Sequence, residues 1–131
     1  MSAFRFDPAR GRIHLRMEGF LSLEQATEIR RQVDDACGRI RSAGGTLSML
    51  ADMTEYPPQS RSVNDIGVEI AAAVAATPRT GYAVVTGSAL QRLRLRRVLE
   101  AAQPSFFERQ DEAAAWLGWE PGWIDAAASR G

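Results

Sequence analysis

The sequence has no lysine, one cysteine and one histidine, and each shortage excludes a class of chemistry. Without lysine, all sixteen basic side chains are arginine, which excludes a P-loop phosphate clamp, a Schiff base and a Ser-Lys catalytic pair. The single cysteine, Cys37, forms no intramolecular disulfide. The single histidine, His14, excludes a multi-histidine metal site. We therefore expect neither a metal nor another cofactor.

Long apolar runs and an excess of one charge are missing as well. The longest mainly apolar stretch, 66–76, is far shorter than the roughly 20 residues that span a bilayer. The first residues lack the apolar segment of a signal peptide, so we expect a cytoplasmic protein without a transmembrane segment. The sixteen basic and sixteen acidic side chains cancel. Because nucleic-acid-binding proteins normally carry a basic excess, we expect no nucleic-acid partner.

The first third of the chain alternates between strand and helix patterns. Apolar and polar residues alternate at 4–6 and 13–17 around a turn, which predicts an opening hairpin. An apolar stripe of helical period follows, with a capping box of Ser22 and Gln25 at its start and Gly44 at its end. The continuous apolar run that ends at Asp52 predicts a strand buried on both faces.

The same alternation continues to residue 117. The pair Ser62 and Asp65 predicts the start of the next helix. The later elements are predicted as a helix at 62–76, a strand at 81–86, a helix at 88–102, a short strand at 105–108 and a last helix at 111–117. This order predicts an α/β fold: a small mixed β-sheet of about five strands, opening with a hairpin and covered by about four helices. With no repeat or linker, we expect a single domain over 1–131, with its core at about 4–118 and a C-terminal tail at 119–131.

The order of these segments resembles the STAS fold, and more closely its SpoIIAA-like branch. The segments that carry the resemblance are 13–19 with the following helix, 50–54, 82–97 and 106–117. The resemblance implies a non-enzymatic bacterial protein that binds a partner, sometimes switched by phosphorylation of a serine where the helix after the central strand begins. The family's Asp-Ser-Ser-Gly motif is absent at that place, and the nearest serines are Ser60 and Ser62. SpoIIAA-like proteins have also been likened to lipid-binding domains, which implies an apolar cleft.

The segment after the central strand is a candidate switch or binding loop, because ligands usually meet α/β sheets at the carboxyl ends of the strands. Its residues are Asp52, Thr54, Ser60, Arg61 and Ser62. Asp52 either binds a ligand or accepts N–H groups that hold the turn. A receiver-domain phosphoacceptor at Asp52 is excluded, because that chemistry needs a lysine. Ser60 and Ser62 either cap the helix or place a phosphate at its positive N-terminal end.

The arginine-rich helix at 88–102 is a candidate partner surface. Its buried stripe is predicted as Leu95, Val98, Leu99 and Ala102. A second edge combines apolar side chains with arginines, as a protein interface or an anionic head-group site does. The residues of this surface are Leu90, Arg92, Leu93, Arg96 and Arg97. The alternative is an ordinary solvated helix face.

The remaining candidates receive structural interpretations. We expect His14 to point to solvent from its strand, and Cys37 to be a small buried apolar residue. The tryptophans Trp116, Trp119 and Trp123 are predicted as packing anchors, with a homodimer contact left open for the last two. No residue is assigned to catalysis.

The sequence therefore favours a regulatory or protein-interaction module with an unidentified protein partner. The alternative is a carrier or sensor of a small apolar or lipid-like ligand, held between the sheet and the 62–76 helix. An enclosed apolar cavity beneath 66–74 would favour the carrier, and a solid core the interaction module. A homodimer is left open.

Overall fold

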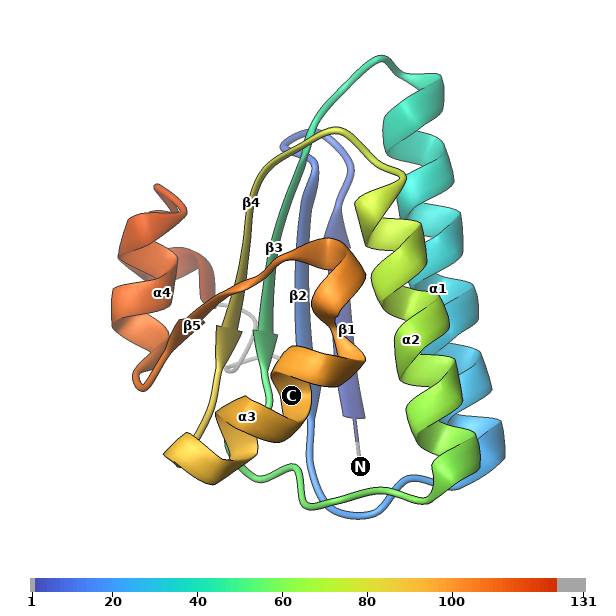
Figure 1. Ribbon diagram of the computed structural model, residues 1–131. Coiled ribbons are helices and arrows are strands. Elements are labelled where there is room, and N and C mark those ends of the chain that lie inside the picture. The colour runs from blue at the N-terminus through green and yellow to red at the C-terminus, as the bar shows by residue number, and fades with distance from the viewer. Residues whose placement is uncertain (1, 125–131) are drawn as a thin grey trace.

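A computed structural model describes residues 2–124 as a five-stranded mixed sheet with the strand order β1-β2-β3-β4-β5. β1 (Ser2–Asp7) and β2 (Arg12–Met17) form an antiparallel hairpin. β3 (Leu47–Asp52), β4 (Arg79–Val85) and β5 (Ser105–Phe107) then add in turn, each parallel to β2 (Figure 1). The predicted α/β sheet with its opening hairpin is confirmed.

Helices cover both faces of this sheet (Figure 1). The α-helices with defined bounds among the described residues are α1 (Leu23–Ser42), α2 (Arg61–Ala75), α3 (Ala89–Val98) and α4 (Gln110–Trp116). A 3-10 turn, η1 (Glu100–Ala102), extends α3 to the predicted helix end. On one face the sheet packs against α1, α2, α3 and η1, and on the other it packs against α4.

The central strand β3 is buried on both faces, as its continuous apolar run predicts. Met49 packs in the larger core under α1 and α2, whereas the next residue, Leu50, packs in the smaller core under α4. β4 repeats this division, with Val84 in the larger core and Val85 in the smaller one. Because successive side chains of a strand point to opposite faces, a strand covered on both sides needs no polar alternation.

Local signals at the helix ends are mostly confirmed. Ser22 and Gln25 form the predicted capping box at α1, and Gly44 has a left-handed backbone with φ of 68° after its end. Of the two serines left open as the cap of α2, Ser60 is the N-cap, so the helix starts earlier than the Ser62 and Asp65 pair predicts. The Ser60 hydroxyl accepts the backbone N–H of Val63 at 3.3 Å, which places Ser62 inside the first turn.

Packing continues beyond residue 118, where the sequence pattern loses its periodicity. Trp119 and Trp123 are buried in the smaller core beside Leu50 and Val85. The Trp119 indole N–H donates to the Ser48 hydroxyl at 2.8 Å. Trp119 and Trp123 are therefore packing anchors within one chain. A homodimer contact that involves them stays a prediction.

His14 does not point to solvent, contrary to the sequence-based expectation. It lies half-buried on the face of β2 that the C-terminal segment covers, with its ring centroid 6.4 Å from those of both Trp119 and Trp123. Its Nε2 lies 3.3 Å from the side-chain oxygen of Gln110. The expectation failed because the sequence pattern did not reveal a second layer over this face.

Burial of His14 predicts a pH-dependent stability. Desolvation lowers the pKa of His14 below its usual value, although a hydrogen bond to Gln110 opposes this shift. The unfolded chain therefore binds a proton near pH 6.5 that the folded chain binds only at lower pH. We expect the free energy of unfolding to fall as the pH drops below about 6.5. Urea unfolding between about pH 7 and pH 5.5 measures this slope.

The matched variant for this experiment is His14→Gln, which keeps a polar side chain near Gln110 but does not titrate. Its slope should be smaller than that of the natural chain over the same pH window. Equal slopes in the two proteins would show that other groups carry the pH dependence.

Candidate functional site

The carboxyl ends of β2, β3 and β4 meet at one edge of the sheet, at the lower end of Figure 1. The connections that follow these strands lead into the N-termini of α1, α2 and α3. The candidate loop and the candidate arginine helix therefore lie at the same edge of the molecule (Figure 1). This is the edge where α/β sheets usually bind ligands and partners.

Asp52 holds the first turn of the candidate loop. Its Oδ1 accepts the backbone N–H of Thr54 at 3.1 Å and the Thr54 hydroxyl at 2.7 Å. Both contacts are local, and they agree with the interpretation of Asp52 as a turn-stabilising residue. The carboxylate is thus already engaged by its own loop.

Gln59 fastens the second half of the loop to the connection between β2 and α1. Its side-chain oxygen accepts the backbone N–H of Leu21 at 2.9 Å. Its amide nitrogen donates to the carbonyl of Gly19 at 3.0 Å and to that of Pro57 at 2.8 Å. Gln59 thereby joins the proline segment to the connection that carries Phe20, whose side chain is exposed.

Gln91 joins the loop to α3 from inside the protein. It is only 5% exposed, and its side-chain oxygen accepts the backbone N–H of Gly87 at 2.6 Å. Its amide nitrogen donates to the carbonyl of Tyr56 at 2.9 Å and to that of Met53. Sequence reasoning missed this residue. The sequence does carry one signal for its burial: Gln91 lies four residues before the buried Leu95, on the same side of the helix.

The loop and α3 together form a pocket of about 250 Å³. Its lining residues are Tyr56, Pro57, Pro58, Gln59, Asn64, Arg94, Leu95, Arg97 and Val98. Arg97 is thus the member of the candidate partner surface that the structure brings to the loop. Arg94 joins it, although the sequence analysis did not include that residue.

One outward stripe of α3 combines two leucines with two arginines. Leu90, Leu93, Arg94 and Arg97 follow one another at helical spacing, and the leucines are 65% and 58% exposed. The opposite stripe is buried at Leu95, Leu99 and Ala102, as predicted, whereas Val98 of the predicted stripe is only partly buried and lines the loop pocket.

The arginines of α3 divide into two groups. Arg94 and Arg97 line the loop pocket, whereas Arg92 and Arg96 do not. The Arg96 guanidinium lies 5.7 Å from the ring centroid of Phe106, on the β5 side. Within residues 2–124, none of these four arginines forms an ion pair. The helix therefore presents charge that no ion pair among the described residues neutralises.

The other predicted loop residues lie outside the pocket. The Ser60 hydroxyl is used as the helix cap, while Arg61 and Ser62 are exposed in the first turn of α2. Regulation through phosphorylation of Ser62 or Ser60 stays a prediction.

Beneath α2 the larger core is nearly solid. The cavity bounded there by Ile66, Ile70, Leu15 and Tyr82 measures about 30 Å³. This is the room that about one water molecule occupies in liquid water. A lipid chain does not fit this space unless the core opens.

The side chains around the loop pocket are mainly apolar groups and hydrogen-bond donors. Arginine and amide groups donate hydrogen bonds, and the phenol of Tyr56 stays protonated because burial raises its pKa to about 12. Residues 2–124 contain no cluster of three or more metal-ligating side chains and no helix of the length and apolar character that a bilayer crossing requires. Comparison with family models and with curated proteins finds no match.

Proposed function

We propose that the chain is a non-enzymatic protein-interaction module of the SpoIIAA-like or STAS type, a regulatory protein of the bacterial cytoplasm. The observation that carries this proposal is the pocket that Pro57 and Pro58 share with Arg94 and Arg97. Loop and helix are joined there by the buried amide of Gln91, so the pocket is held in shape before a partner arrives. A preorganised site loses less entropy on binding.

The partner is an acidic protein segment with apolar anchors. Guanidinium groups bind carboxylates in a bidentate manner, and Arg94 and Arg97 have no carboxylate of their own within the described residues. The prolines and Val98 add apolar side chains to the lining of the same pocket. The exposed Leu90 and Leu93 extend this contact along α3. A segment that alternates leucine-like and acidic side chains complements this surface.

The size of the cavity beneath α2 favours this function over ligand carriage. At about 30 Å³ it is an order of magnitude below the roughly 300 Å³ at which small-molecule sites begin. The surface pocket beside α3 is larger, at about 250 Å³, and lies where a partner reaches it.

Charge reversal by Arg94→Glu with Arg97→Glu should weaken partner binding by at least about tenfold, because both salt-bridge donors become repulsive. The partner is first captured from the source bacterium with the natural chain, then purified and titrated calorimetrically against each variant. The unfolding transition of the variant, followed by circular dichroism, should remain cooperative, because neither arginine is buried.

The matched control is Arg92→Glu with Arg96→Glu, which makes the same charge change on the same helix but outside the pocket. Its effect on the affinity should be much smaller. Equal losses in both double variants would place the contact elsewhere on α3. An unchanged affinity in the Arg94 and Arg97 variant would refute the proposed surface.

A further inference from the structure

A second surface lies along β1, the edge strand at the other end of the strand order from β5. β1 pairs with β2 over six consecutive residue pairs without a bulge. Within residues 2–124, its outer edge makes no backbone hydrogen bond. An edge strand of this length with free N–H and C=O groups is a template for another strand.

The usual protection of an edge strand is missing here. Proteins commonly guard such edges with proline, a bulge or an outward charged side chain. β1 contains no proline, and the chain itself engages both of its charged side chains. Asp7 pairs with Arg10 of the hairpin turn, and Arg5 folds onto the C-terminal segment. The Arg5 guanidinium lies 3.8 Å from the ring centroid of Trp123 and donates to the Trp123 carbonyl at 2.6 Å. Arg5 therefore leaves the edge open.

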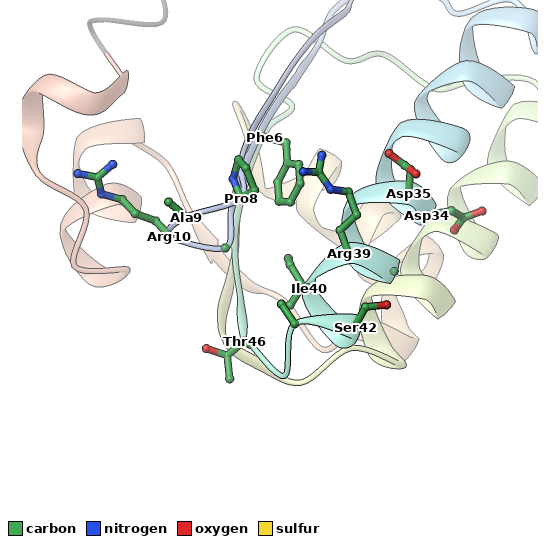
Figure 2. A pocket seen from close by; sticks show the side chains of 14 residues that line it. Phe6, Pro8, Ala9, Arg10, Asp34, Asp35, Arg39, Ile40, Ser42 and Thr46 are labelled. Atoms are coloured by element: carbon green, nitrogen blue, oxygen red, sulfur yellow. The ribbon is translucent and has the colours of Figure 1, made fainter.

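Two hollows accompany this edge between β1 and α1. The larger measures about 1020 Å³ and lies between the hairpin turn and the second half of α1. Figure 2 shows Phe6 and Pro8 on one wall of it and Asp35 and Arg39 on the other. The smaller hollow, of about 330 Å³, lies between Phe4 and the first half of α1. Together they provide space for side chains of an added strand.

Unpaired acidic side chains outnumber unpaired basic ones along these hollows, because Arg10 in the larger hollow pairs with Asp7 and Glu28 in the smaller hollow pairs with Arg31. Glu24 lines the smaller hollow, and Asp34 and Asp35 line the larger one. None of the three forms an ion pair within residues 2–124. The one arginine on α1 that faces them without an ion pair, Arg39, lies 5.3 Å from the ring centroid of Phe6. The surface is thus complementary to a cationic segment.

We propose that β1 binds an extended segment of another protein as an additional strand, with arginine or lysine at its ends and β-branched residues between them. Glu24 and Asp35 lie about 16 Å apart along α1, at about 1.5 Å per helical residue. A strand covers that distance in about five residues, at about 3.3 Å each. Basic side chains four to six positions apart on one strand face therefore reach both carboxylates.

A second copy of the chain fits this edge less well. Antiparallel pairing of two β1 strands sets α1 beside its symmetry mate. The contact between the two α1 helices would then contain the unpaired carboxylates Glu24, Asp34 and Asp35 of both copies. Like charges across such a contact are destabilising, whereas a basic segment neutralises them.

The probe is a fluorescein-labelled, amidated peptide of sequence Arg-Thr-Val-Thr-Val-Thr-Arg, titrated by fluorescence anisotropy. It should bind at least about tenfold more tightly than the peptide with glutamate in place of both arginines. The variant Glu24→Lys with Asp35→Lys should reverse this preference. The control Glu55→Lys with Glu108→Lys makes the same charge change outside both hollows and should keep it. Arg94→Glu with Arg97→Glu should bind the probe normally, which separates this inference from the proposed function.

Backbone methylation of the probe tests strand addition itself. Alternate N–H groups of a strand point to the same side. Methylation of either the valine nitrogens or the threonine nitrogens should therefore abolish binding, while methylation of the other set is tolerated. Binding that survives both methylations, equal affinity for the acidic peptide, or no binding at about 1 mM would overturn the proposal. A dimer in sedimentation that dissociates in Phe4→Pro would assign the edge to a second copy and also overturn it.

Discussion

Replacement of Trp119 by alanine is expected to lower the free energy of unfolding by about 3–5 kcal/mol. The indole is only 4% exposed and packs with its ring centroid 4.8 Å from that of Trp123. Its loss leaves a cavity in the smaller core and leaves the Ser48 hydroxyl without the indole donor at 2.8 Å. Urea unfolding followed by circular dichroism measures the change.

Trp116 provides the matched control for this experiment. It is also a tryptophan of the C-terminal region, but its side chain is 51% exposed. Its ring centroid lies 5.4 Å from that of Phe107. Trp116→Ala should therefore cost about 1 kcal/mol or less. Equal losses at Trp116 and Trp119 would contradict the burial that the structure assigns to the C-terminal segment.

The burial of Trp119 is a part of the fold that the sequence pattern did not predict. Helix and strand patterns report the face that each element buries, and they predicted β3, the Ser22 cap and the Gly44 terminator. Residues 119–124 carry no such pattern, because isolated tryptophans fill gaps in a layer formed by distant elements. His14 was misplaced for the same reason, since its burial comes from residues about a hundred positions away.

The candidate site was predictable in its parts but not as a whole. The proline loop and the arginine helix each carry a local signal, and both lie at the carboxyl edge expected of an α/β sheet. Arg97 faces Pro58, whereas Arg96 does not. This difference depends on the rotation of α3 about its axis. The hydrogen bonds of Gln91 contribute to fixing this rotation, and they join segments separated by more than thirty residues.

Gln91→Leu is expected to lower the free energy of unfolding by about 2–3 kcal/mol. Leucine keeps much of the buried volume but leaves the Gly87 N–H and the Tyr56 and Met53 carbonyls without the amide partner. An unsatisfied buried polar group costs more than a lost exposed hydrogen bond. Urea unfolding gives the global effect. The control is Gln32→Leu on α1, a glutamine whose side chain forms no hydrogen bond with the described residues.

Hydrogen exchange separates a positioning role of Gln91 from a general loss of stability. The Gly87 amide is held by the Gln91 side chain, so its exchange should accelerate more than that of amides in β3, which open only with the whole sheet. Partner affinity should fall with it, because the loop and Arg97 no longer hold one pocket. If instead all amides accelerate equally while the affinity of the folded fraction is unchanged, Gln91 stabilises the fold without shaping the interaction site.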